Sequence, residues 1–395
     1  MHVPPARKAR PAILSLVDHW RYLISRIEYK ADIPGSTRRH PKSRNPILNS
    51  TPSMTDPSTF NGPLHPDITP HLDADYAAFH NKYLADRPAI HKIPWDPACR
   101  VGPINLGGLE PCKVGSVRDL TIPGTPPVSV RVFTPPGERP ASGWPVLVYF
   151  HGGGWVLGNI DTENSFSART SLTAKCVVVS VDYRLAPEHV FPAAVEDSWT
   201  ALEWVYEHGA AELGINPSKI AVGGSSAGGN LSAVMTQRAV QRSPQLPIKY
   251  QLLIVPVTDN TVQEDGSSLL PTHYESWVKW KNTTPLTPEK MLWFRSHYLP
   301  DKSKWTHVDA SPLFQKDDHV WSQLPDAWVG VAALDILRSE GEAYAQKLKE
   351  ARKNVELVVY PGAPHSIMAM DEAIKIGFQL GEDAAQALYK AFYVS

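Results

Sequence analysis

A series of short apolar runs rich in β-branched residues constrains the fold of this 395-residue chain more than any other feature. Most of these runs are continuously apolar, which is typical of strands buried on both faces of a parallel sheet. Two earlier runs, 117–122 and 128–134, are separated by Pro and Gly and predict a β-hairpin. The six later runs span residues 146–150, 177–181, 220–223, 252–255, 328–332 and 355–360.

Helical segments lie between the later runs. Residues 192–208 repeat apolar side chains at a period of about 3.6, and Gly209 is expected to end that helix. Further helices are expected at 227–242, 341–353 and 371–393. This alternation of strands and helices predicts an α/β fold, a mostly parallel sheet with helices on both faces and right-handed crossovers.

Two regions do not follow the alternation. Residues 61–113 hold one helix-like segment at 73–84, and residues 258–312 hold no strand run. We expect both regions to form a helical cap over one edge of the sheet. The second region is rich in aromatic residues, namely Tyr274, Trp277, Trp280, Trp293, Phe294 and Tyr298.

The first part of the chain has a different composition. Residues 1–50 hold ten Lys or Arg but three Asp or Glu, and they are rich in Pro, Ser and Thr. We expect residues 1–60 to be a disordered basic tail and residues 61–395 to form one domain. A mitochondrial presequence within residues 1–50 is an alternative, and so is a translation start at Met54.

Charge and cysteine usage exclude several classes of protein. Lys plus Arg is 39 and Asp plus Glu is 40, a balance that argues against a nucleic-acid or anionic-membrane binder. No run approaches the roughly 18 apolar residues of a membrane span. Cys99, Cys112 and Cys176 are far apart and odd in number, so we expect neither a disulfide framework nor a structural zinc site. A reducing, cytoplasmic location follows as the expectation.

The segment Gly224–Gly228 carries the central chemical signal. It reads Gly-Ser-Ser-Ala-Gly, which fits G-x-S-x-G with Ser226 in the middle. An expected strand precedes it and an expected helix follows, which is the context of a nucleophile elbow. Glycine two residues before and after Ser226 relieves the crowding of such a turn. Ser225 is the alternative nucleophile, but its corresponding neighbours are Gly223 and Ala227.

A glycine-rich loop follows the first parallel strand. It reads His-Gly-Gly-Gly-Trp from His151 to Trp155, and its glycines let backbone N–H groups approach a developing oxyanion. A phosphate-binding loop is the alternative, but the lysine of a P-loop and the G-x-G-x-x-G spacing are missing. We expect His151 to orient the loop, because it precedes the serine and is out of order for a base.

A serine nucleophile needs a base and an acid that orients it. Where the serine stands on a nucleophile elbow, the chain order is Ser, acid, His. Asp335 follows the run 328–332 and His365 follows the run 355–360, so both fall at strand ends on the edge that holds Ser226. Glu340 is the alternative acid, although it lies further from the strand end.

From about residue 70 to its end, the chain resembles the hormone-sensitive-lipase-like branch of the α/β-hydrolases, which includes bacterial esterases and arylacetamide deacetylases. The segments that carry the resemblance are His-Gly-Gly-Gly at 151–154, Asp-Tyr-Arg-Leu-Ala-Pro-Glu at 182–188, Phe-Pro-Ala-Ala at 191–194 and Gly-Ser-Ser-Ala-Gly-Gly-Asn at 224–230. Together, at these spacings, the motifs are highly specific.

The resemblance implies the α/β-hydrolase fold, with an eight-stranded, mostly parallel sheet and a helical cap. It implies neither cofactor nor metal, and it permits a homodimer. It implies that Arg184 and Glu188 are structural and can pair. It also implies a catalytic triad and an oxyanion hole, formed by Ser226, Asp335 and His365 and by the backbone N–H groups of Gly153, Gly154 and Ala227.

Three positions depart from the family pattern. Ser225 stands where Asp is common, Ser339 stands where an acid is frequent, and Ser366-Ile367 replaces a usual Gly-Phe pair. No member of the implied triad is lost. These departures bear on substrate preference and loop stability rather than on the class of reaction.

These observations predict a cofactor-free serine carboxylesterase that hydrolyses short-to-medium-chain or aryl esters through an acyl-enzyme. The partner expected is a small ester, with no nucleic acid and no membrane span. An amidase, peptidase or lactonase with the same triad is an alternative. A non-enzymatic receptor is another, because a group of plant hormone receptors keeps the fold and the serine but lacks the histidine. His365 argues against that alternative.

Overall fold

The computed structural model describes residues 57–100 and 107–394. The expectations for the basic tail and for a presequence concern residues that lie almost entirely outside this range. The chain divides into two units, Met1–Thr51 and Pro52–Ser395. Every element described below belongs to the second unit.

The centre of the second unit is one sheet with the strand order β1-β2-β4-β3-β5-β6-β7-β8. β1 and β2 form an antiparallel hairpin and β2 also pairs antiparallel with β4, whereas every later pairing is parallel. The predicted hairpin and the mostly parallel eight-stranded sheet are therefore confirmed. The strands are β1 (Ser116–Ile122), β2 (Val128–Thr134), β3 (Trp144–Phe150), β4 (Val177–Asp182), β5 (Ile215–Ser225), β6 (Ile248–Ile254), β7 (Asp326–Ala332) and β8 (Val355–Tyr360).

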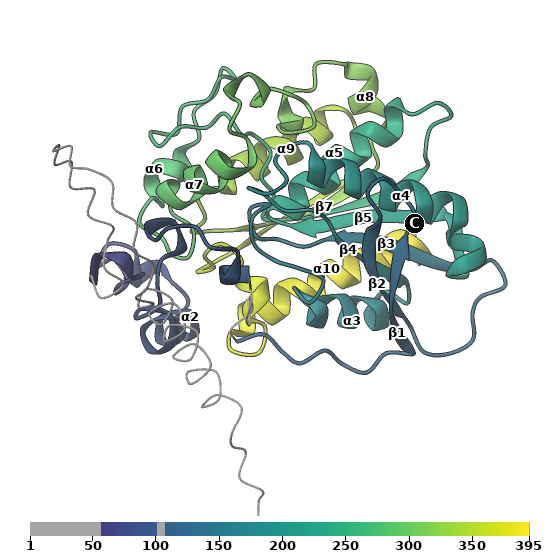
Figure 1. The fold of residues 1–395 in the computed structure, drawn as a ribbon, viewed down its shortest axis with the longest axis horizontal. Coiled ribbons are helices and arrows are strands. Elements are labelled where there is room, and N and C mark those ends of the chain that lie inside the picture. Colours follow the sequence, from purple (N-terminus) through teal and green to yellow (C-terminus); the bar gives the residue numbers. More distant parts are fainter. Residues whose placement is uncertain (1–56, 101–106, 395) are drawn as a thin grey trace, which may run out of the picture. The chain divides into compact units, whose positions relative to one another are not determined.

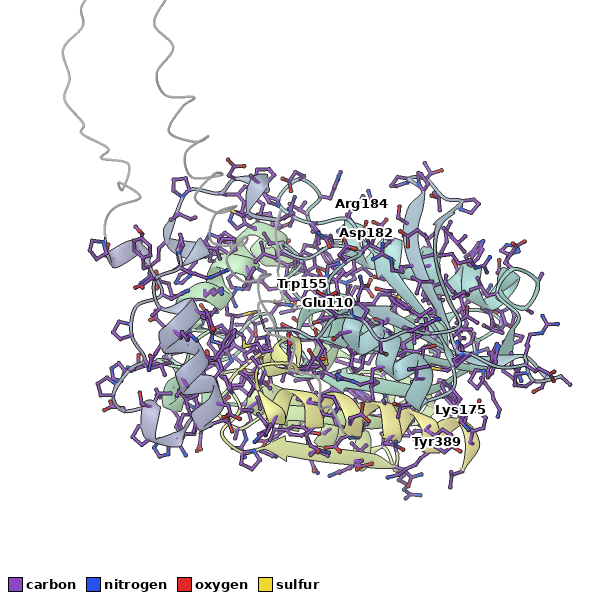
Figure 2. The ribbon with its side chains drawn as sticks, turned by 90° about the horizontal axis from the view of Figure 1, so that it is seen from below. Glu110, Trp155, Lys175, Asp182, Arg184 and Tyr389 are labelled. Carbon is purple, nitrogen blue, oxygen red and sulfur yellow. The ribbon has the colours of Figure 1, made fainter. Side chains whose placement is uncertain are left out.

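Helices cover both faces of the sheet (Figure 1). One face carries α4 (Ala193–Glu212), α5 (Ala227–Gln241), α8 (Asp318–Gln323) and α9 (Arg338–Glu350). The other face carries α3 (Asn164–Thr173) and α10 (Lys375–Tyr393). At the far end of this second layer, Lys175 lies beside the ring of Tyr389 (Figure 2), with Nζ 5.9 Å from the ring centroid. The sheet thus has two apolar clusters, one on each side.

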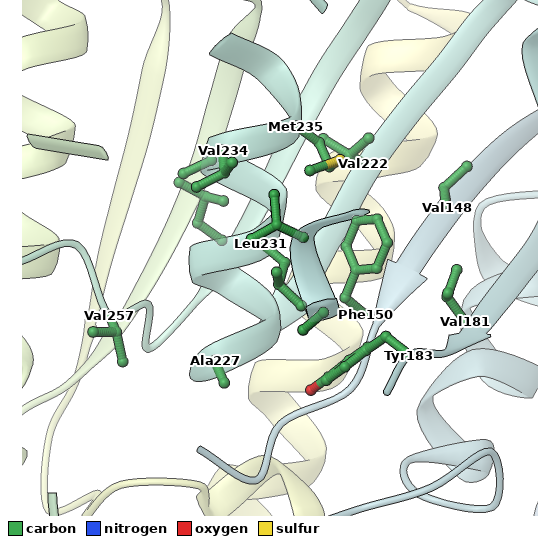
Figure 3. Packing of buried hydrophobic residues seen from close by; sticks show 14 of the residues in the cluster. Val148, Phe150, Val181, Tyr183, Val222, Ala227, Leu231, Val234, Met235 and Val257 are labelled. Carbon is green, nitrogen blue, oxygen red and sulfur yellow. The ribbon is translucent and has the colours of Figure 1, made fainter. Parts of the chain in front are cut away.

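Helix α5 holds a central place because it packs on the middle of the sheet. Figure 3 shows its residues Leu231 and Met235 close to Val222 of β5 and Phe150 of β3. All four side chains are fully buried, and each contributes roughly 1.5–3 kcal/mol by leaving water. This packing fixes the position of the first turn of α5, which begins directly after Ser226.

Several predicted boundaries are shifted by a few residues, among them those of the helices predicted at 341–353 and 371–393, and two further ones differ for a clear reason. The helix expected to end at Gly209 continues to Glu212, because Gly209 is a site of close packing and not a stop. A Cβ at Gly209 would lie 2.9 Å from Cγ1 of Ile215 on β5. The strand expected at 220–223 is also longer, since β5 begins at Ile215 and its first part includes polar residues that are not buried.

The two regions predicted as a cap contain short helices. They are α2 (Ala74–Phe79), which continues into a π-turn at His80–Leu84, α6 (Glu275–Lys279) and α7 (Pro288–Tyr298). Short 3-10 turns occur at Pro57–Thr59, Thr69–His71, Ile90–Lys92, Pro97–Arg100, Lys302–Lys304, Pro312–Phe314 and Ile367–Met370.

The two regions contact each other. The Tyr76 hydroxyl donates to the Thr284 carbonyl at 2.9 Å, and the rings of Trp95 and Trp293 lie 5.9 Å apart. Among the residues that the structure describes, no helix combines the length and the apolar composition needed to cross a membrane.

Candidate active site

Ser226 lies in the tight turn between β5 and α5. Its backbone has φ 54° and ψ −114°, a conformation that non-glycine residues rarely adopt and that is typical of strained functional turns. Its N–H donates to the Ile254 carbonyl at 2.8 Å, which ties the turn to the end of β6. A Cβ at Gly228 would overlap the carbonyl of Phe150, so the predicted need for glycine here has a direct steric cause.

Three of the predicted site residues form a hydrogen-bonded row. The Ser226 Oγ lies 2.9 Å from Nε2 of His365, and Nδ1 of His365 lies 2.7 Å from Oδ2 of Asp335. Because an ionised carboxylate only accepts, Nδ1 carries the proton in this arrangement and Nε2 is free to accept from the serine hydroxyl. The histidine is therefore oriented as a base for Ser226.

The row is held by the loops that follow β7 and β8. Asp335 receives a second hydrogen bond from the N–H of Leu337 at 3.0 Å, which fixes its carboxylate. The N–H of Leu334 donates to the Ala363 carbonyl at 3.0 Å and so joins the acid loop to the histidine loop. Asp335, His365 and Ser226 are 1%, 5% and 7% exposed, so the row is largely shielded from water.

The glycine loop after β3 lies beside this turn. Gly153 and Gly154 have φ values of +116° and +61°, which favour glycine. Neither of their N–H groups donates to another residue of the described chain. Ala227 is the first residue of α5, where an N–H has no partner within the helix. The loop and the first turn of α5 thus both present unused N–H donors beside the serine turn.

Helix α7 packs against this loop. The Phe294 ring lies so close to Gly154 that a Cβ there would overlap it. Trp155, labelled in Figure 2, stacks on Tyr298 with ring centroids 4.2 Å apart. Apolar rings therefore pack directly against the segment that holds the free N–H groups.

His151 is buried beneath the loop. Its Nδ1 lies 2.7 Å from the Gly152 carbonyl, so Nδ1 donates, and its ring stacks on Tyr183 at 4.3 Å. Burial lowers the pKa of His151 to about 4. These contacts are those of a neutral side chain that orients the loop, the role expected for it.

The alternatives that the sequence left open lie elsewhere. The Ser225 hydroxyl donates to Oε1 of Glu163 at 2.6 Å, not to a histidine. Oε2 of Glu340 accepts from the N–H groups of Thr258 and Asp259, both at 2.8 Å. Glu340 therefore anchors the segment after β6.

The expected pairing of Arg184 with Glu188 is wrong. Arg184, labelled in Figure 2, pairs with Asp197 of α4 at 2.8 Å, and Glu188 pairs with Arg100 at 2.7 Å. Each of the two residues ties the segment after β4 to a different part of the chain. Proximity in sequence gave the wrong partner because both side chains point to other elements.

Sequence reasoning missed Glu163. It is 7% exposed, and its carboxylate accepts from the residue that precedes Ser226. In the sequence it is one of several acidic residues after the glycine loop, and no spacing distinguishes it from the exposed Asp161. In the part of the chain that the structure describes, no group of three or more His, Cys, Asp or Glu side chains could hold a metal ion.

Comparisons with known proteins show the family of this chain. Residues 147–369 match the model of the Abhydrolase_3 family, described as having the alpha/beta hydrolase fold. An AB hydrolase superfamily protein of Schizosaccharomyces pombe is 44% identical over 339 residues, which cover 84% of this chain and 97% of that protein.

Two similar proteins have esterase names. The carboxylesterase NlhH of Mycobacterium tuberculosis is 41% identical over 248 residues, covering 63% of this chain and 73% of its own. The solved structure of an esterase from Pyrobaculum calidifontis has a TM-score of 0.64 at 37% identity, covering 70% of this chain and 86% of that one.

Proposed function

This chain belongs to the hormone-sensitive-lipase-like branch of the α/β-hydrolase family, and we propose that it acts as a serine esterase through Ser226, His365 and Asp335. Its similarity to named esterases identifies it as a carboxylic ester hydrolase. The observation that carries the proposal is the row from Ser226 Oγ to His365 at 2.9 Å and from His365 to Asp335 at 2.7 Å. This is the arrangement that activates a serine hydroxyl.

In the first half of the reaction, Ser226 Oγ bonds to the ester carbonyl carbon while its proton passes to Nε2 of His365. The carbonyl oxygen becomes an anion that accepts hydrogen bonds from the N–H groups of Gly153, Gly154 and Ala227. His365 then returns the proton to the leaving alcohol as the ester C–O bond breaks, which leaves an acyl-enzyme. Asp335 holds the tautomer of His365 and stabilises its positive charge.

In the second half of the reaction, a water molecule acts as the nucleophile and the same steps take place. His365 takes a proton from the water as its oxygen bonds to the acyl carbon. Collapse of this second tetrahedral intermediate breaks the bond to Ser226 Oγ, and the proton returns to the serine. The products are a carboxylic acid and an alcohol, and the enzyme is regenerated.

The proposed substrates are short-to-medium-chain or aryl esters. Two similar proteins, 34% and 35% identical to this chain, are named ethyl acetate hydrolase and arylesterase, and these names support the proposal. Residues 61–113 and 258–312 are proposed as the cap, which α7 joins to the oxyanion loop.

Hydrolysis of p-nitrophenyl acetate, butyrate, octanoate and palmitate tests the proposal. Ser226→Ala should lower kcat by several orders of magnitude, because only binding and the oxyanion donors remain. Ser198→Ala is the matched control, since it removes a buried serine hydroxyl that donates to Ala194 O on α4. Near-wild-type turnover by Ser226→Ala would contradict the assignment of the nucleophile. Greatest activity on the palmitate ester would contradict the proposed substrate range.

A further inference from the structure

Glu163 accepts three hydrogen bonds in a buried position beside the proposed catalytic row. Its Oε1 accepts from the Ser225 hydroxyl at 2.6 Å. Its Oε2 accepts from the Tyr149 hydroxyl at 2.8 Å and from the Gly152 N–H at 3.4 Å. A buried carboxylate is retained only when hydrogen bonds or charges compensate its lost hydration, and here three donors do so.

Two of these donors belong to the two segments that the proposed reaction must keep in register. Ser225 directly precedes the nucleophile Ser226, and Gly152 directly precedes Gly153 of the oxyanion loop. The segments already touch, since a Cβ at Gly152 would lie 2.6 Å from the Ser225 Oγ. One carboxylate therefore joins the end of β5 to the loop after β3.

The backbone of Glu163 is itself in an unfavourable conformation. It has φ 62° and ψ 26°, in the left-handed region, immediately before the first residue of α3. A non-glycine residue is held there only when its surroundings determine the conformation. Its carbonyl accepts from Ser167 N at 3.0 Å, so α3 anchors the residue from behind.

The charges around Glu163 are those of a buried hydrogen-bond acceptor rather than of a surface ion pair. Among the described residues, no Lys or Arg forms an ion pair with Glu163. Burial raises the pKa of the Glu163 carboxyl, while its hydrogen bonds and the nearby His365 lower it. The other titratable groups that face it are the hydroxyls of Tyr149 and Tyr183.

We propose that Glu163 is a positioning residue that links the oxyanion loop to the nucleophile turn, so that the donors and Ser226 act as one rigid unit. The proposal rests on the function proposed above and assigns a role to a residue outside the triad. It also accounts for Ser225, which stands where the resembling family commonly has Asp. Here the carboxylate comes from another segment, and the Ser225 hydroxyl donates a hydrogen bond to it.

The linkage is tested with four variants. Glu163→Met keeps the length of the side chain but cannot accept hydrogen bonds. Glu163→Gln is the conservative rescue, because its amide can still accept from Gly152 and donate to the Ser225 hydroxyl. Ser225→Ala removes the link from the other side. Gln251→Met is the matched control, because it removes a buried hydrogen bond to Pro325 O, a contact outside the proposed catalytic and oxyanion segments.

The readouts separate positioning from folding. They are kcat and KM for p-nitrophenyl butyrate, the rate of serine phosphorylation by diethyl p-nitrophenyl phosphate, and the unfolding temperature. For Glu163→Met we expect kcat and the phosphorylation rate to fall on the order of 10- to 100-fold, with KM changed far less, because a small misplacement of reacting groups costs rate. Glu163→Gln should recover most of the loss, and Gln251→Met should leave both rates unchanged.

The double variant gives the sharpest comparison. Glu163→Met with Ser225→Ala should be no slower than Glu163→Met alone, because both changes break the same link. The proposal would be overturned if the rate losses of the two single variants multiply in the double variant. It would also be overturned if Glu163→Met folds and reacts at the wild-type rates. If Glu163→Met does not fold, wild-type rates in Ser225→Ala would overturn it equally.

The failure of the linkage is distinguishable from the failure of the proposed function. The phosphate reagent should react once per wild-type molecule and should not react with Ser226→Ala. If Ser226→Ala reacts as wild type does, the assignment of the nucleophile fails and the linkage fails with it. If that control holds while Glu163→Met reacts at the wild-type rate, only the linkage fails.

Discussion

At the scale of single residues, the site depends on which nitrogen of each histidine carries a proton and on which group accepts a hydrogen bond from it. His151 is neutral because it is buried, and its Nδ1 proton is committed to Gly152 O. His365 is committed to Asp335 in the same sense, so its other nitrogen faces Ser226. The two histidines, which follow different strands, thus have different roles: His151 holds its loop and His365 faces the nucleophile.

The neutrality of His151 makes stability depend on pH. Its pKa is about 4 in the folded protein and about 6.5 when unfolded, so between these values the unfolded chain binds a proton that the folded chain does not. Stability is therefore lost as pH falls from about 6.5 towards 4, by at most about 1.4 kcal/mol per pH unit.

His151→Asn keeps a donor near Gly152 and removes this titration. Urea unfolding at pH 8, 6 and 5 measures the free energy of unfolding of both proteins. We expect the difference in free energy of unfolding between wild type and variant to shift in favour of the variant from pH 8 to pH 6 and further at pH 5. If the free energies of unfolding of the two proteins run parallel across the whole pH range, burial does not lower the pKa of His151.

At the scale of elements, the β5–turn–α5 unit concentrates the steric demands of the site. Gly224 and Gly228 let the turn pass under the end of β3, since a Cβ at either position would overlap backbone atoms there. Helix α5 can begin at Ala227 because its apolar face is fully buried against the sheet. The conformation of Ser226 is thus maintained by packing on both sides of the turn.

Gly228→Ala should be strongly destabilising, because the clash is with backbone that cannot move aside. We expect a loss of about 3 kcal/mol or more in the free energy of unfolding. Gly137→Ala is the control, since Gly137 has φ +101° but no atom within 4 Å of a Cβ there. Its expected loss is about 1–2 kcal/mol from backbone strain alone. Equal losses in the two variants would contradict the steric explanation.

At the scale of the whole molecule, the described residues build a complete sheet with two apolar clusters. Both clusters are formed by residues from Leu64 onward. All the residues proposed to act in the reaction lie between His151 and His365, at the ends of strands within this sheet. We therefore propose that residues 61–395 form the catalytic domain.

A chain that begins at Met54 tests this division. It should unfold within about 2 °C of the full chain, and its kcat/KM on p-nitrophenyl butyrate should stay within about two-fold. Thermal unfolding followed by circular dichroism and the ester assay measure the two quantities. A large drop in either would place part of the working domain before Met54.

The sequence by itself determined the order of the eight strands, because apolar runs that are buried on both faces carry a local signal. It also placed α4, α5, α9 and α10 between or after them, but it did not predict α3 or α8. It also located Ser226, Asp335 and His365, since strand ends on one edge of a parallel sheet must come together. Boundaries were less certain: Gly209 looked like a helix stop, and only its contact with Ile215 shows why glycine is needed inside α4.

Only the tertiary structure decided which polar side chains meet across segments. Arg184 pairs with Asp197 and not with Glu188, and Glu163 lies against Ser225, 62 positions further along the chain. Such pairings depend on how loops from different strands pack, and neither periodicity nor local propensity encodes that. Buried apolar periodicity is a property of each segment, whereas a hydrogen bond between distant side chains exists only once the segments are assembled.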